Sequence, residues 1–226
     1  MTVFLLSEKI AFPPPRYSNP DGLLAVGGDL SRERLVLAYR MGIFPWYSAG
    51  DPVLWWSPDP RLILPVDAFH ISRSLKKVIG KGIFRITFDT AFDRVISGCA
   101  ARRKEGDSGT WIVPEMADAY TGLHEAGIAH SVEAWSGDEL AGGLYGVSLG
   151  RCFFGESMFT RAANASKVAL AALVSYIKER GFDFVDCQVT TDHLLRMGAR
   201  EVPREVFLAM LERSMASPSL IGKWGE

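Results

Sequence analysis

The residues best suited to chemistry stand at the end of one apolar stretch, where a carboxylate and a carboxamide lie two positions apart. Residues 181–188 contain Phe182, Phe184 and Val185, and the stretch is interpreted as a buried strand. Because side chains alternate across a strand, we expect Asp186 and Gln188 to project from the same face. Burying two polar groups costs free energy unless they are paired or used. Two interpretations therefore stay open: a strand end that satisfies backbone groups, or a catalytic pair in which Asp186 polarises Gln188 or holds a cation.

A glutamate and a cysteine near this strand are further candidates. Glu156 follows an expected apolar strand and would need a partner if buried, but it could equally be a surface acid in a turn. Cys187 could form a Cys–His nucleophile with His130 or His193. Strand alternation points Cys187 away from the face of the polar pair, which favours a buried, inert thiol.

Aromatic residues are frequent and lie between turn formers. Trp46, Trp55, Trp56 and Trp111 are flanked by Pro and Gly, and such aromatic planes can stack on a nucleic-acid base. The alternative is packing in the core or at a domain interface. Both interpretations remain open for the set as a whole.

Composition excludes several classes of protein. A net charge of −1 argues against a protein that coats nucleic acid by electrostatics alone, although a focused contact remains possible. The three cysteines are far apart and the four histidines lack metal-ligand spacing, so we expect free thiols and no metal site. The glycines form no phosphate-binding loop of the ATP or NAD type. The chain shows neither a basic leader nor an apolar run of about 20 residues, so we expect a cytoplasmic protein.

The element pattern predicts an α+β protein in two parts. Residues 1–65 are rich in Pro, Gly and Trp and predict a small irregular domain with one helix over 31–41. From residue 66 onward helices and strands mix, so 66–226 is the expected catalytic domain. The expected helices cover 71–79, 91–104, 114–126, 163–180, 191–197 and 203–215; the expected strands cover 84–88, 130–135, 139–147, 151–154 and 181–188, with a tail from 217.

Seven motifs in a fixed order resemble one bacterial enzyme family. They occupy residues 21–30, 42–46, 54–61, 70–74, 109–112, 155–159 and 186–188. Together they are similar to the leucyl/phenylalanyl-tRNA–protein transferases over about residues 10–213. Such enzymes move Leu or Phe, less often Met, from aminoacyl-tRNA to the N-terminal Arg or Lys of a protein. The resemblance further implies a GNAT-like fold for the second domain, no cofactor, and products that enter the N-end rule pathway through ClpS and ClpAP.

The resemblance also implies roles for individual residues. Asp186 and Gln188 match the catalytic pair, with the Gln side-chain carbonyl drawing a proton from the attacking amine, and Glu156 matches an acid lining the same site. The aromatics that hold the 3′-terminal adenosine match Trp46 and Trp111, and the pocket for the transferred side chain matches Leu144, Phe153, Leu173 and Val185. Leu173 replaces a Phe of a well-known relative. Val185 alternates away from Asp186 on an ideal strand, so its role requires a bulge or a twist.

Basic residues cluster in one short segment. The candidates for contact with the tRNA are Arg73, Lys76, Lys77, Lys81 and Arg85. The alternative for this patch is an ordinary solvated face. Two rival functions also remain: an acyltransferase that uses a CoA thioester, and a non-catalytic module that binds a tRNA end or a peptide.

Overall fold

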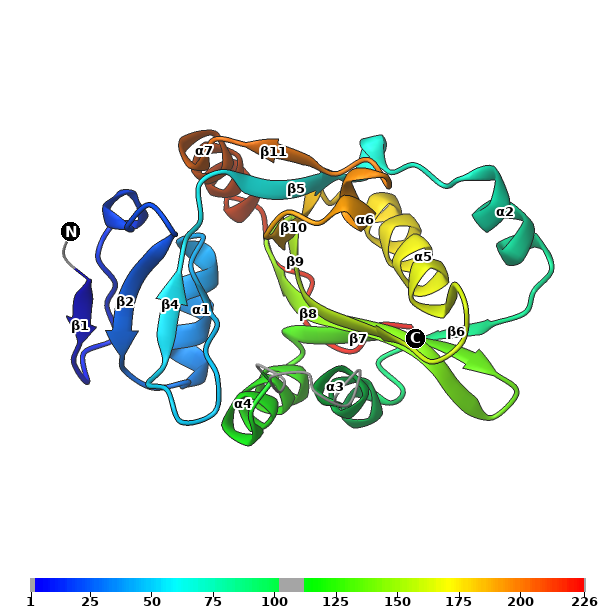
Figure 1. Ribbon diagram of the computed structural model, residues 1–226, viewed down its shortest axis with the longest axis horizontal. Helices are drawn as coiled ribbons and strands as arrows, with labels where there is room; N and C mark the ends of the chain where they lie inside the picture. Colours follow the sequence, from blue (N-terminus) through cyan, green and yellow to red (C-terminus); the bar gives the residue numbers. More distant parts are fainter. Residues whose placement is uncertain (1–2, 102–111, 226) are drawn as a thin grey trace.

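The computed structural model describes residues 3–101 and 112–225, which form a smaller and a larger β-sheet (Figure 1). The smaller sheet has the order β1-β2-β4-β3 and is covered by helix α1. Its elements are β1 (Phe4–Leu6), β2 (Leu23–Gly27), α1 (Arg32–Arg40), β3 (Phe44–Pro45) and β4 (Leu54–Trp56). The α1 helix was predicted within a residue of its ends, whereas these short strands were not predicted at all.

The larger sheet has the order β11-β5-β10-β9-β8-β7-β6 and is mixed. β9 and β10 run parallel, and the other neighbours are antiparallel. Its strands are β5 (Arg61–Pro65), β6 (Arg85–Phe88), β7 (Ala129–Ser136), β8 (Glu139–Leu149), β9 (Cys152–Thr160), β10 (Phe184–Gln188) and β11 (Arg200–Val202). The helices are α2 (Arg73–Gly80), α3 (Phe92–Ala100), α4 (Pro114–Glu125), α5 (Ala165–Glu179), α6 (Asp192–Leu195) and α7 (Arg204–Met215). The predicted α+β class is confirmed.

Strand β5 connects the two parts of the protein. It lies inside the region expected as a small N-terminal domain, yet it pairs with β10 and β11 in the larger sheet. The division at residue 65 stays a prediction. The consequence for the site is that the chain enters the larger sheet directly beside β10.

Helices cover both faces of the larger sheet (Figure 1). Helix α5 packs on β7, β8 and β9 from one face, and its buried stripe includes Val168, Leu173 and Ile177. Helices α3 and α4 cover the other face, where their buried residues join those of α1 and α7 in one core. The spacing of three to five residues along α5 is what an amphipathic helix needs to bury one side.

The C-terminal segment is not a free tail, so the prediction of a tail from residue 217 is wrong. Trp224 is only 2% exposed and joins the core on the α5 face. Its backbone N–H donates to Asp89 Oδ2 at 2.7 Å, and its indole stacks on His130 with 3.9 Å between ring centroids. The segment is short and rich in Gly, Ser and Pro, so it carries no periodic pattern that could have predicted this docking.

Strands β9 and β10 separate at their C-terminal ends, and this separation creates the site. Their pairing ends at Phe154 opposite Asp186. Beyond that point each strand has a bulge in its pairing with its other neighbour. On β9, the residues before and after Glu156 pair with β8 and Glu156 is skipped. On β10, the residues before and after Cys187 pair with β5 and Cys187 is skipped. A bulge leaves one residue outside the ladder and redirects the side chains after it. The expected strand over 151–154 is thus longer than predicted, and Glu156 lies within it.

Candidate active site

A cavity of about 450 Å³ opens at the separation of β9 and β10, on the face covered by α5. Its lining is mainly apolar and includes all four residues expected to form the side-chain pocket: Leu144, Phe153, Leu173 and Val185. Leu170, Met158 and Leu194 complete the apolar wall. Val185 lines the cavity while its neighbour Asp186 does not, so the two alternate as on an ordinary strand, and the bulge or twist expected for Val185 was not required.

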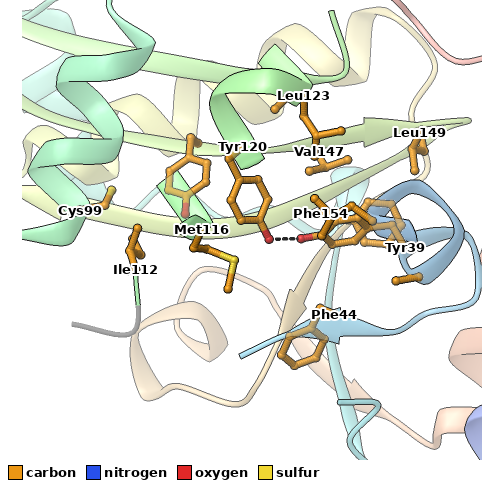
Figure 2. Packing of buried hydrophobic residues seen from close by; sticks show 14 of the residues in the cluster. Tyr39, Phe44, Cys99, Ile112, Met116, Tyr120, Leu123, Val147, Leu149 and Phe154 are labelled. Atoms are coloured by element: carbon orange, nitrogen blue, oxygen red, sulfur yellow. Dashed lines mark hydrogen bonds between the residues drawn. The ribbon is translucent and has the colours of Figure 1, made fainter. Parts of the chain in front are cut away.

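Glu156 and Gln188 meet at the polar end of this cavity. The Gln188 amide donates through Nε2 to Glu156 Oε1 at 2.8 Å, and the Tyr120 hydroxyl donates to Glu156 Oε2 at 2.8 Å. The Tyr120 hydroxyl is also hydrogen-bonded to that of Tyr39, as the dashed line in Figure 2 shows. Tyr39 comes from α1 and packs on Phe154 at 5.0 Å. The first part of the chain therefore contacts the polar end of the cavity through this hydroxyl pair.

Burial gives Glu156 an unusual acidity. It raises the pKa of the carboxyl to about 7, and the negative charge of Asp186 acts in the same direction. Hydrogen bonds from Tyr120, Tyr39 and Gln188 oppose the rise. Burial also raises the pKa of Tyr39 and Tyr120 well above that of an ordinary tyrosine, so both hydroxyls keep their protons. A carboxyl with a pKa near neutrality can accept or release a proton under working conditions, which a surface acid in a turn would not do.

Asp186 lies on the other face of β10, so the expectation that it shares a face with Gln188 is wrong. Its carboxylate binds Arg61 through Nε at 2.8 Å and Nη2 at 2.6 Å, and its side chain is fully buried. Cys187, predicted to point away from Gln188, lines the same cavity as Gln188. The physical reason is the bulge at Cys187, after which Gln188 adopts a φ of 63° and reverses the expected alternation.

Cys187 has the properties of an inert thiol despite its position. Burial raises the pKa of this thiol far above its usual value, and the Asp186 charge adds to the effect. Its Sγ lies 3.8 Å from the Val185 carbonyl. His130 instead bonds Asp89 at 2.8 Å, and burial lowers the pKa of His193, which lines the cavity. This arrangement fits the expectation that the thiol is not a nucleophile.

The tryptophans divide between the two interpretations. Trp46 is 43% exposed and, with Glu156 and Gln188, lines a small second cavity of about 110 Å³. Its ring packs on that of Trp56 at 5.9 Å, and the Trp56 indole donates to the Trp46 carbonyl at 2.6 Å. Trp55 is fully buried and donates to the Gly27 carbonyl, so it belongs to the core. The expected role of Trp111 falls outside the described residues.

The remaining predicted features are placed as follows. The five residues of the basic patch are all exposed. Arg73, Lys76 and Lys77 lie on α2, Lys81 directly follows this helix, and Arg85 is the first residue of β6. Within the described ranges there is no group of three metal-ligating side chains. Over the same ranges, none of the helices has the length and apolar character needed to cross a bilayer.

Sequence reasoning missed three side chains of the site. Arg61 ends the motif at 54–61, so the motif itself was a signal, although its partner was not. Tyr39 and Tyr120 look like ordinary residues of amphipathic helices. Nothing in their spacing indicates that their hydroxyls meet, because the two helices are about 80 residues apart in the chain and only tertiary packing joins them.

Comparison with protein families gives two adjoining matches. The family model described as leucyl/phenylalanyl-tRNA protein transferase matches residues 63–212, and the model of that protein's N-terminal domain matches residues 28–59. A leucyl/phenylalanyl-tRNA–protein transferase of Desulfatibacillum aliphaticivorans is 60% identical over 224 residues, which cover 99% of this chain and 96% of the relative. One from Myxococcus xanthus is 54% identical over 228 residues, covering 100% and 97%.

Similarity to solved structures is more distant. L-PGS from Bacillus licheniformis gives a TM-score of 0.41 at 14% identity, over 74% of this chain and 53% of that protein. An aminoglycoside acetyltransferase from a soil metagenomic sample gives a TM-score of 0.39 at 15% identity, over 51% and 85%.

Proposed function

Because the chain belongs to the leucyl/phenylalanyl-tRNA–protein transferase family, we propose that it moves Leu or Phe, less often Met, from aminoacyl-tRNA to proteins. The acceptors are proteins with an N-terminal Arg or Lys. The observation that carries the proposal is the apolar cavity ending in Gln188 and Glu156. Its apolar lining suits a leucyl or phenylalanyl side chain, and its polar end provides the groups that an attacking amine needs.

The donor is an activated ester, so the reaction requires neither ATP nor a cofactor. The acceptor amine forms a bond to the ester carbonyl carbon while the bond from that carbon to the ribose oxygen breaks. The amine loses one proton, and the ribose hydroxyl of the departing tRNA gains one. An α-amino group has an ordinary pKa of about 7.7–8.0, so only a modest pull is required near neutral pH.

Gln188 and Glu156 have complementary tasks in this reaction. Because Gln188 donates through Nε2 to Glu156, the Oε1 atom of the same amide is directed to accept a hydrogen bond from the amine. Glu156, with its pKa of about 7, receives the proton. Most of the acceleration then comes from alignment of the amine with the ester. The negative charge of Glu156 also suits the cationic side chain of an Arg or Lys acceptor.

Contacts to the tRNA involve an aromatic residue beside the cavity and a separate basic patch. The exposed face of Trp46 stacks on the 3′-terminal adenosine, together with Trp111. The patch Arg73, Lys76, Lys77, Lys81 and Arg85 binds phosphates of the tRNA. Reversing these five charges should weaken tRNA binding and flatten its dependence on salt concentration. Binding that keeps its affinity and its salt slope would remove the patch from the proposal.

The cellular role follows from the product. A protein that gains an N-terminal Leu or Phe becomes a substrate of the N-end rule pathway, delivered by ClpS to ClpAP in the cytoplasm.

Choice among donors rests on pocket shape, where one methylene changes discrimination by about 1–3 kcal/mol.

One assay tests the proposal directly. The protein is incubated with labelled Leu-tRNA and a peptide beginning with Arg, in the absence of ATP and CoA. Label in the peptide supports the proposal, and a matched peptide beginning with Glu is the negative control. Binding of both substrates without transfer would favour a non-catalytic module, and transfer only from a CoA thioester would favour a different acyltransferase.

A further inference from the structure

Arg61 is a fully buried arginine that contacts two aromatic rings and one carboxylate. Its guanidinium lies between two aromatic rings, 4.8 Å from the centroid of Phe44 and 4.5 Å from that of Phe207. The rings come from β3 and α7, so the smaller sheet and the last helix both hold it. Beside these two rings the guanidinium directs its Nε and Nη2 atoms to the carboxylate of Asp186.

The pairing with Arg61 gives Asp186 a different task from proton transfer. Both carboxylate oxygens accept from the guanidinium, and Oδ1 also accepts the backbone N–H of Gln188 at 3.0 Å. The Asp186 side chain is thus held in a buried bidentate pair with arginine. It also lies outside the set of residues that line the cavity, so it does not reach the substrate amine directly.

The bond from Gln188 N–H to Asp186 supports a backbone conformation that would otherwise be unfavourable. Gln188 has a φ of 63°, a left-handed value that non-glycine residues rarely adopt. In this conformation the side chain turns into the cavity and donates to Glu156. Strain of this kind persists only when the surrounding structure over-determines it, and the fixed carboxylate is such a constraint.

We propose that Arg61 is a positioning residue, which acts through Asp186 to hold Gln188 in the left-handed conformation that presents its amide to the substrate. The proposal rests on the function proposed above. Its physical basis is that the Arg61 guanidinium finds its charge partner in Asp186, while its Nη1 atom is buried without a hydrogen-bond partner. Losing either member leaves an uncompensated buried charge, so the two should behave as one unit.

A double-mutant cycle separates this role from a direct catalytic role of the Asp186 charge. The variants are Arg61→Met, Asp186→Asn and the double variant R61M/D186N. Methionine retains the length and apolar contacts of the arginine stem between the two rings. Asparagine retains the Oδ1 that accepts the Gln188 N–H. For each protein, kcat and KM are measured with Leu-tRNA and an Arg-peptide, and thermal unfolding is recorded.

We expect each single variant to lose about 100-fold in kcat, the effect of misplacing a reacting group by about 1 Å. The KM for Leu-tRNA should stay within about threefold, because the apolar lining is unchanged. The double variant should recover kcat about tenfold or more over either single variant, since no lone charge remains and the N–H bond is kept. A double variant no more active than the singles would overturn the proposal, as would an Arg61→Met variant with the parent kcat.

Two controls accompany this cycle. The first separates a loss of folding from a loss of positioning, and the second measures positioning without depending on transferase activity. Arg34→Met removes another fully buried arginine, which bonds backbone carbonyls away from the cavity, and should lower stability without changing kcat of the folded fraction. Hydrogen exchange of the Gln188 amide does not depend on activity. We expect slow exchange in the parent protein and the double variant, and faster exchange in Arg61→Met. Equal protection in all three would refute the positioning role even if the parent protein transferred nothing.

Discussion

Asp186 and Glu156 are two carboxylates on neighbouring strands, yet their surroundings give them opposite properties. Asp186 is fully buried against a guanidinium and accepts three hydrogen bonds from Arg61 and the Gln188 backbone. Glu156 accepts hydrogen bonds from neutral donors, the Tyr120 hydroxyl and the Gln188 amide. Asp186 is paired with the Arg61 guanidinium, whereas burial among neutral donors raises the pKa of Glu156 to about 7.

The difference teaches how one site holds a fixed negative charge beside a group that exchanges protons. Gln188 lies between the two carboxylates, bonded to Asp186 through its backbone and to Glu156 through its side chain. The negative charge of Asp186 itself helps to raise the pKa of Glu156.

The largest effect is expected from removing the fixed charge. Asp186→Ala deletes the acceptor of the Gln188 N–H and leaves Arg61 buried without a counter-ion. We expect transfer to fall below detection in the peptide assay. The free energy of unfolding should fall by about 3–5 kcal/mol, with the protein still folded at 25 °C. Transfer close to that of the parent protein would refute the role of Asp186.

Replacing the proton acceptor should come next. Glu156→Gln removes a group that can take the amine proton, so kcat should fall by about 10²–10⁴-fold. In the parent protein kcat/KM should rise with pH through about 7 as Glu156 ionises, and again near the pKa of the amine. The variant should keep only the second rise. A rise near pH 7 that persists in Glu156→Gln would assign it to another group.

The Glu156→Gln variant also tests, through the pH dependence of stability, whether folding raises the pKa of Glu156. The folded pKa of about 7 lies above the ordinary value of 4.5, so folding favours the protonated acid. The contribution to stability is complete below about pH 4.5 and is lost as the pH rises through 7. Between pH 4.5 and 7, the free energy of unfolding obtained from denaturant titrations should therefore fall more steeply with pH in the parent than in the variant. Parallel pH profiles would contradict the raised pKa.

A smaller effect should follow from removing one neutral donor. Tyr120→Phe deletes the hydroxyl that donates to Glu156 Oε2, so the pKa of Glu156 should rise further. At pH 7 we expect kcat/KM to fall about tenfold, with partial recovery at higher pH, since a lost bond to a charged group is worth about 1.5–3 kcal/mol. Tyr17→Phe, at an exposed tyrosine, is the matched control. An unshifted pH midpoint in Tyr120→Phe would show that the hydroxyl does not tune the acid.

The smallest effect is expected at Cys187, which lies between Asp186 and Gln188 in the chain. Cys187→Ala removes a thiol whose pKa is raised by burial, so kcat should change by less than about threefold. A loss comparable to that of Glu156→Gln would indicate thiol chemistry and would break the division of tasks between the two carboxylates.

The sequence predicted much of the larger domain because its elements have clear periodicity. The helix over 163–180 and the strands over 130–135 and 139–147 appear as α5, β7 and β8 with small shifts at their ends. Short strands of the Pro- and Trp-rich first part were missed, since three-residue strands leave no measurable alternation. The C-terminal segment was missed because Trp224 docks through partners distant in the chain, among them the Asp89 carboxylate and the ring of His130.

The site shows the same division between local pattern and tertiary packing. Residue types and motif order determined which side chains gather at the cavity: Glu156, Gln188 and the four apolar positions. Strand alternation wrongly placed Gln188 on the face of Asp186 and away from Cys187, because a bulge is decided by pairing with a neighbouring strand. Only the tertiary structure brought Arg61 to Asp186 and the Tyr120 hydroxyl to Glu156. Partners distant in the chain define the surroundings of each carboxylate, so the sequence alone identified the two acids but not how differently they are held.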